Sequence, residues 1–191
     1  MSKIGVGKDI TNSYSSPSVA ENNPTTILVK VSHVAARLDF SQFDVTLNDF
    51  EGNPTVVFDE AKFVNLQQNG KIVEGDASVN VKDGAFLNRS NRIGTKWTDM
   101  GTAYGYANQY KQDSEMNTAL YVKFTVDGRT FEKTYPINPA GITKEVDHNG
   151  IKGGYLYDIK VRWTITPDWG DSTIEFYTRD WVHNSIPEIV L

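Results

Sequence analysis

The chain has 191 residues, a formal net charge of −5 and no cysteine. A chain of this length suits one domain and buries enough surface to fold without a disulfide or a metal. The lack of cysteine excludes a disulfide scaffold, a thiolate zinc site, an iron–sulfur cluster and a cysteine nucleophile. Lysine and arginine are scattered along the sequence, so the basic patch of a nucleic-acid-binding protein is missing.

The sequence contains no segment that predicts membrane insertion or export. No apolar run approaches the ~20 residues of a membrane-spanning helix, and the first residues lack the apolar core of a signal peptide. Two kinds of protein lack such segments: a cytosolic protein, and a secreted protein whose leader has been removed. The missing cysteine and the Thr/Asn-rich, weakly charged surface favour the second.

The N-terminal part predicts a tail followed by strands. Residues 1–24 are small, polar and interrupted by proline, with no apolar period, which predicts an extended tail. From Thr25 onward apolar and polar residues alternate, which predicts strands up to about residue 47. The parity of the alternation changes between Val31 and Val34, which indicates a bend or bulge there.

Residues 94–110 predict a long irregular insertion, because aromatic residues stand there between glycines and polar residues. The aromatic residues are Trp97, Tyr104, Tyr106 and Tyr110. If they are exposed together, they form a stacking surface for a sugar or a partner protein. The alternative is that they close the open end of the core.

Residues 118–137 predict a hairpin. Asp127-Gly128 separates two alternating runs, and both residues tolerate the positive φ that a two-residue turn needs. This turn fixes the register, so Phe124 should lie opposite Phe131 and Lys123 opposite Glu132.

A second long strand is predicted over 155–165, followed by a turn at 167–170 and another strand over 174–177. No window shows a capped helical period. The sequence therefore predicts an all-β sandwich or barrel.

Few residues suggest chemistry. The three histidines, His33, His148 and His183, have no metal-ligand spacing. Asp168 and Asp171 around Trp169 suggest a calcium site or, more simply, a solvated turn. We expect no enzyme activity and no cofactor.

Several segments resemble the fimbrillin family of major and minor fimbrial proteins. The similar segments are 28–40, which holds His33, Ala36 and Arg37; 133–137; 155–161; 174–176; and the pair Asp180-Trp181. Together they span roughly residues 25–181. The resemblance implies a transthyretin-like β-sandwich of antiparallel strands, here with a long irregular insertion. It also implies export as a lipoprotein, trimming by an arginine-specific protease and polymerisation by strand exchange.

The sequence departs from the family pattern in two respects. It lacks the lipobox cysteine, and it shows one sandwich domain, residues 25–181, where the family usually has two. The tails would be residues 1–24 and 182–191. Three interpretations fit this pattern: the chain is the C-terminal half of a family member, a processed form of one, or a shortened homologue.

The expected protein is a structural subunit or adhesin of a bacterial fimbrium on the outer membrane surface. Its expected partners are other fimbrial subunits, and glycans or proteins of host or bacterial surfaces. The C-terminal tail is a candidate donor strand through Ile186, Ile189 and Leu191, and residues 4–10 are a second candidate. The alternatives are a carbohydrate-binding module that uses the loop aromatics, and a β-sandwich glycoside hydrolase with paired carboxylates.

Overall fold

The regular structure of the described part of the chain is entirely β-strand. The computed structural model describes residues 2–4, 31–70, 80–84, 86–88, 92–108, 115–138 and 150–180. No helix in these ranges is long and apolar enough to cross a membrane. The strands are β1 (Ser2–Ile4), β2 (Val31–His33), β3 (Ala35–Leu47), β4 (Val56–Val64), β5 (Leu66–Gln67), β6 (Val81–Lys82), β7 (Phe86–Asn88), β8 (Arg92–Ile93), β9 (Lys96–Tyr106), β10 (Ala119–Val126), β11 (Arg129–Pro136), β12 (Tyr155–Ile165) and β13 (Gly170–Asp180).

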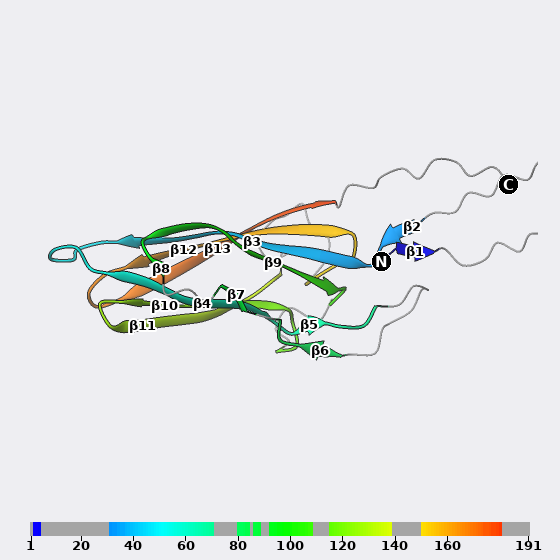
Figure 1. Cartoon of the computed structure of the whole chain (residues 1–191), viewed down its shortest axis with the longest axis horizontal. Helices are drawn as coiled ribbons and strands as arrows, with labels where there is room; N and C mark the ends of the chain where they lie inside the picture. The colour runs from blue at the N-terminus through cyan, green and yellow to red at the C-terminus, as the bar shows by residue number, and fades with distance from the viewer. Residues whose placement is uncertain are drawn as a thin grey trace, which may run out of the picture.

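Two sheets pack face to face and form a sandwich (Figure 1). One sheet has the order β11-β10-β4-β7, with β8 also on β4, and the other has the order β13-β12-β3-β9-β5-β6. Strands β1 and β2 pair separately, so the segment predicted as a tail contains a short strand. The β-sandwich predicted from the alternating pattern is confirmed.

The core between the sheets is rich in aromatic rings. Phe43 of β3 lies 5.3 Å from Trp97, 5.4 Å from Phe58 and 5.3 Å from Phe124, measured between ring centroids. Trp163 approaches Phe124 at 5.1 Å. Phe43 and Trp163 belong to one sheet, whereas Phe58 and Phe124 belong to the other, so these edge-to-face contacts join the two layers.

The hairpin predicted over 118–137 is confirmed. Phe124 pairs with Phe131 and Lys123 pairs with Glu132, as the two-residue turn requires. Asp127 and Gly128 have φ values of 44° and 83°. The two phenylalanine rings stack at 5.3 Å in the core.

The sheets are not purely antiparallel, which corrects the prediction. Strands β3 and β12 pair in parallel, with Arg37 opposite Leu156 at one end and Leu47 opposite Ile165 at the other. Parallel neighbours need a long connection, and the chain between these two strands crosses into the other sheet and back.

The irregular insertion predicted over 94–110 is wrong for the part that the structure describes. Residues 96–106 form β9, which pairs along β3 from Lys96 to Tyr106. The glycines and polar residues that suggested a loop are accommodated by a bulge, where Asp99 and Gly101 have φ values of 52° and 144°. The predicted bend before β3 is confirmed, since β2 ends at His33 and β3 begins at Ala35.

Candidate functional site at the open edge of β9

The second sheet divides where β9 meets β5. On this side of β9 the register gives one pair only among the described residues, Gln67 with Tyr106. The chain enters β5 from β4 through Asn65, whose φ of 55° turns it from one sheet to the other. From Gly101 to Gly105, β9 therefore pairs with β3 along one edge and with no described strand along the other.

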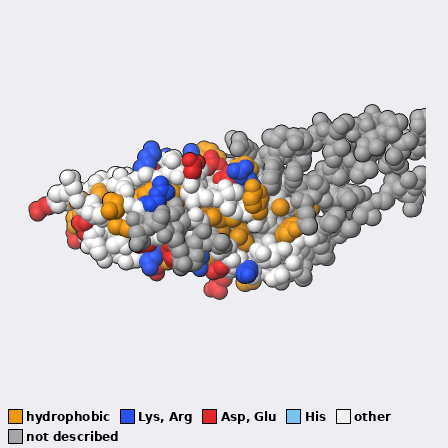
Figure 2. Space-filling view, in the orientation of Figure 1, with side chains coloured by type: hydrophobic (Ala, Val, Ile, Leu, Met, Phe, Trp, Pro, Cys, Tyr) orange, Lys and Arg blue, Asp and Glu red, His pale blue; other side chains and the backbone are white. Residues whose placement is uncertain are grey.

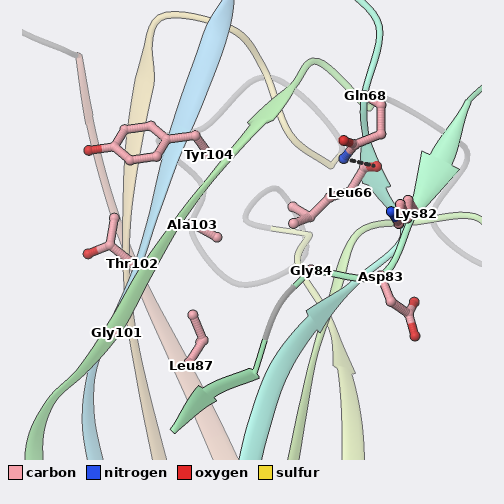
Figure 3. Close-up of a pocket in the computed structure, with 10 residues that line it drawn as sticks. All are labelled: Leu66, Gln68, Lys82, Asp83, Gly84, Leu87, Gly101, Thr102, Ala103 and Tyr104. Carbon is pink, nitrogen blue, oxygen red and sulfur yellow. Dashed lines mark hydrogen bonds between the residues drawn. The ribbon is translucent and has the colours of Figure 1, made fainter.

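A groove lies along this open edge. It encloses about 540 Å³, and its lining residues are Leu66, Gln68, Lys82, Asp83, Gly84, Leu87, Gly101, Thr102, Ala103 and Tyr104. In Figure 3 the side chains of Leu66, Leu87 and Ala103 lie in the space between β9 and the β5–β6 side. Tyr104 and Thr102 point to the other side of β9 (Figure 3). Apolar side chains therefore form part of the lining, and Gln68, Lys82 and Asp83 contribute polar groups to it.

Glycines allow the two walls of the groove to lie close to each other. A Cβ on Gly101 would lie 2.9 Å from the Cβ of Leu87, and a Cβ on Gly84 would lie 2.8 Å from Cδ1 of Leu66. A Cβ on Gly105 would lie 3.1 Å from Cδ2 of Leu66. Glycine at these positions lets the two leucines form the floor beside the β9 backbone.

The rim of the groove carries polar groups of both signs. The Lys62 ammonium pairs with the Asp83 carboxylate at 2.9 Å, and Lys82 is exposed beside them. The Gln68 amide donates to the backbone oxygen of Leu66 at 3.1 Å. No three His, Asp or Glu side chains in the described ranges are grouped so that they could hold a metal ion.

One buried asparagine, Asn108, fixes the point where the sheet divides. Asn108, two residues after the end of β9, donates from Nδ2 to the backbone oxygens of Asn65 and Met116 and to the Thr118 hydroxyl, each at 3.0 Å. Its backbone pairs with Ile151. These bonds join four separate segments, so the open edge belongs to a rigid framework.

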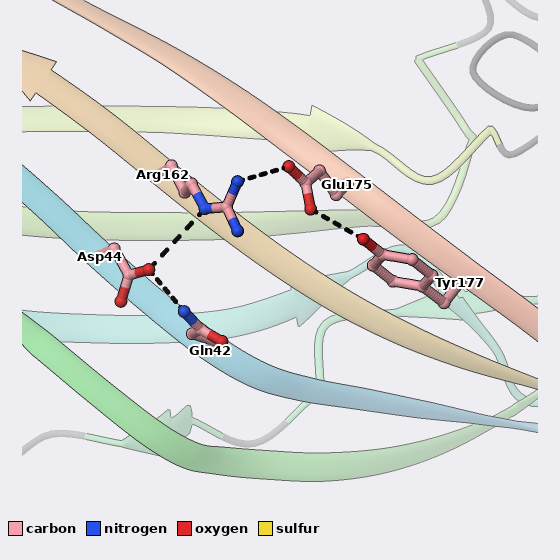
Figure 4. A network of polar contacts seen from close by, with 5 residues as sticks. All are labelled: Gln42, Asp44, Arg162, Glu175 and Tyr177. Carbon is pink, nitrogen blue, oxygen red and sulfur yellow. Dashed lines mark hydrogen bonds and ion pairs between the residues drawn. The ribbon is translucent and has the colours of Figure 1, made fainter.

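A chain of polar contacts covers the outer face of the same sheet (Figure 4). Arg162 bonds Glu175 at 2.8 Å and lies 3.8 Å from Asp44, which accepts from the Gln42 amide. The Tyr177 hydroxyl donates to Glu175, which raises the pKa of Tyr177. These contacts link β3, β12 and β13 at the surface, where ion pairs stabilise little. They cover part of the outer face of the sheet.

The aromatic residues predicted to stack on a ligand are separated by the structure. Trp97 is 3% exposed and packs on Phe43, so it belongs to the core and no ligand reaches it. Tyr104 is 57% exposed on the outer face, and Tyr106 is half-buried. Tyr110 lies outside the described residues.

Other predicted sites are placed only in part. Trp169 is 56% exposed in the β12–β13 turn, with Asp168 and Asp171 also exposed. The predicted donor residues Ile186, Ile189 and Leu191 lie outside the described part of the chain, as do the side chains of His33, His148 and His183.

Sequence reasoning missed the groove residues Leu66, Leu87 and Ala103. The only signal for them was the glycine pair Gly101 and Gly105, which looked like loop composition. Over the visible face, charged side chains of both signs are intermixed (Figure 2), in agreement with the scattered charges of the sequence.

No protein-family model and no curated protein match the sequence. Among the solved structures, 13 chains match. A candidate cell adhesion protein from Parabacteroides distasonis superposes with a TM-score of 0.63 at 20% identity, over 80% of this chain and 53% of that one. This similarity shows that the two proteins share a fold.

Two further solved structures match at lower scores. The tip fimbrial protein of Porphyromonas gingivalis, truncated at its C-terminus, has a TM-score of 0.44 at 14% identity, over 80% of this chain and 53% of that one. A candidate cell adhesion protein from Bacteroides eggerthii has a TM-score of 0.44 at 16% identity, over 80% and 57%. The present chain thus spans about half the length of the structures it matches.

Proposed function

We propose that this protein is a structural subunit or adhesin of a bacterial surface fimbrium, and that it joins its neighbours by strand exchange. The observation that carries the proposal is the open edge of β9, in a sandwich fold shared with a candidate cell adhesion protein. An open edge offers unpaired N–H and C=O groups to an added strand. The resemblance of the sequence to fimbrillins supports the same role and a location on the outer membrane surface.

Arg37 does not suit the arginine-specific trimming that the resemblance implies. The first arginine of the sequence is Arg37. It lies within β3, where its guanidinium pairs with Asp39 at 2.9 Å. Cleavage after Arg37 would cut a central strand of the sandwich.

Deletion of residues 185–191 tests the proposal. We expect the full chain to form filaments in electron microscopy and the deletion variant to stay monomeric with an unchanged far-ultraviolet circular dichroism spectrum. A matched control exchanges Ser185 and Glu188 for alanine, which keeps the apolar residues Ile186, Ile189 and Leu191 and should keep the filaments. Filaments that form equally well from the deletion variant would refute strand exchange through this segment.

Carbohydrate binding is a second candidate function, because Tyr104 exposes its ring beside polar Thr102 on the outer face. Aromatic rings of this kind stack on sugars. A glycan array compares the full chain with Tyr104→Ala. Binding that is lost in the variant supports a lectin-like site, and an array without any hit rejects it.

A further inference from the structure

We infer that the outer face of the sheet formed by β13, β12, β3 and β9 binds a neutral oligosaccharide that lies across the strands, with Tyr104 and Tyr177 stacking on sugar units at its two ends. The inference rests on the second candidate function, carbohydrate binding, and adds to it a second aromatic anchor and the length and charge of the ligand. It does not depend on strand exchange or on the groove beside β9.

Two exposed tyrosines mark this face. Tyr104 of β9 is 57% exposed and Tyr177 of β13 is 53% exposed. The other large hydrophobic side chains that are exposed in the described ranges belong to the other sheet or to connections between strands, and they are Ile93, Met116 and Trp169. An aromatic ring that stays exposed on a sheet face offers a flat apolar surface on which a sugar ring can stack.

The strand register places both rings on the same side of the sheet. Tyr104 lies opposite Arg37 of β3. Tyr177 lies opposite Asp158 of β12, which itself lies opposite Asp39 of β3. Arg37 and Asp39 are two residues apart on one strand and alternate with core residues, so all these side chains point away from the core.

The distance between the rings sets the length of the ligand. Strands β3 and β12 lie between β9 and β13, so the two tyrosines are three strand spacings, about 14 Å, apart across the sheet. Their positions also differ by two residues along the strands, which adds an offset of about 7 Å. A single sugar ring is much shorter than this distance. A glycan that contacts both tyrosines is therefore an oligosaccharide.

Polar groups occupy the surface between the two rings. The Thr102 hydroxyl donates to the Asp39 carboxylate at 2.7 Å, and the Arg37 guanidinium pairs with the same carboxylate at 2.9 Å. The Ser41 hydroxyl donates to the Asp158 carboxylate. These bonds hold donors and acceptors at fixed positions on the face. Because a sugar hydroxyl both donates and accepts, it suits a surface that presents groups of both kinds.

The balance of charge favours a neutral ligand. The described charged side chains beside and between the rings are of both signs, and they are Arg37, Lys160, Asp39, Asp158 and Glu175. Because the two signs nearly cancel, the face has no strong potential that would attract a charged ligand. An uncharged glycan therefore suits this face better than a sialylated or sulfated one.

The neighbours of Tyr177 hold its ring in place. Its hydroxyl donates to Glu175 at 3.1 Å, and Glu175 accepts from Arg162 at 2.8 Å (Figure 4). The Lys160 ammonium lies 4.8 Å from the centroid of the Tyr177 ring. A side chain that is already fixed loses little conformational entropy when a ligand binds. The side chain of Tyr104 points away from the groove and onto this outer face (Figure 3).

A glycan array tests the inference. It carries neutral linear oligosaccharides of one to six glucose, mannose or galactose units, together with sialylated and sulfated glycans. The full chain is compared with its Tyr104→Ala and Tyr177→Ala variants, and isothermal titration calorimetry gives the dissociation constant for the best hit. We expect binding to neutral chains of several units, weakened at least fivefold by each substitution.

The matched control is Trp169→Ala, which removes a ring that is 56% exposed but lies outside this face. This variant should bind as tightly as the natural chain. All three variants should keep the circular dichroism spectrum of the natural chain, because each substituted side chain is largely exposed.

The possible outcomes separate the inference from the proposed function. Weaker binding in Tyr104→Ala but not in Tyr177→Ala would keep a sugar site at Tyr104 and reject the extended one. Binding of charged glycans only, binding of single sugars as tightly as long chains, or equal weakening by Trp169→Ala would also reject it. An array without any hit would overturn the inference together with carbohydrate binding, while the filament assay still decides the fimbrial role. A dimer in analytical ultracentrifugation that both tyrosine variants lose would assign the face to a second copy of the chain.

Discussion

Tyr135 carries its phenol in the core, where the residue is 3% exposed, and burial raises its pKa to about 12. In the unfolded chain the group returns to its ordinary pKa of 10.0. Between these values the unfolded state binds fewer protons than the folded state, so the free energy of unfolding falls as the pH rises. The contribution is fully present below pH 10 and amounts to roughly 3 kcal/mol.

We therefore expect urea denaturation midpoints that hold steady up to about pH 10 and drop above it. Burial raises the pKa of Tyr121 to about 12 as well, so more than one tyrosine contributes to the drop. The matched variant Tyr135→Phe keeps the ring and removes the ionisation, so its stability should fall less steeply above pH 10. An equal fall in both proteins would contradict a raised pKa at Tyr135.

For single residues, the sequence did not show which aromatic side chains are exposed. Trp97 and Tyr104 stand in the same glycine-rich stretch, yet one is 3% exposed and the other 57% exposed. Residues of opposite parity on one strand face opposite sides, and these two have opposite parity. That rule applies only to a strand, and the glycines and polar residues of this stretch predicted a loop instead.

Elements differ in how much of their structure is encoded locally. The β10–β11 hairpin was predictable because its Asp127-Gly128 turn fixes the pairing within one short segment. Strand β9 was not, since its partner β3 lies far earlier in the sequence and the glycines lower its strand propensity. The groove beside it escaped prediction for the same reason.

The glycine at the β9 bulge can be tested. Gly101→Ala should lower the free energy of unfolding by roughly 2 kcal/mol, because the backbone has φ 144° and the new Cβ would lie 2.9 Å from the Cβ of Leu87. The control Gly52→Ala has φ 86° but open space around its Cβ, so it should cost about 1 kcal/mol. Urea denaturation measures both. A smaller loss at Gly101 than at Gly52 would contradict the close approach of Leu87.

Across the whole molecule, the order of strands depends on contacts that sequence patterns do not carry. The alternation of residues 155–165 predicted a strand, but nothing in it specified a parallel neighbour from residues 35–47. Sheet order is decided by how the two apolar faces meet around Phe43, Phe124 and Trp163. The periodicity of the sequence was enough to predict the all-β class. The parallel pairing within the sheet could not be predicted in this way, because it depends on how the two sheets pack.

That strand order predicts how hydrogen exchange is distributed over the molecule. Strands β3, β10 and β12 each have a neighbour on both sides, so their amides should be the slowest to exchange. The amides of β9 from Gly101 to Gly105 that face the groove lack a described strand partner and should exchange at least ~100-fold faster than those that bond to β3. Amide-resolved exchange measured by nuclear magnetic resonance on the monomeric protein gives both rates. Uniform protection along β9 would mean that its outer edge is already occupied in the monomer, and alternating protection would show that the edge is open to an added strand.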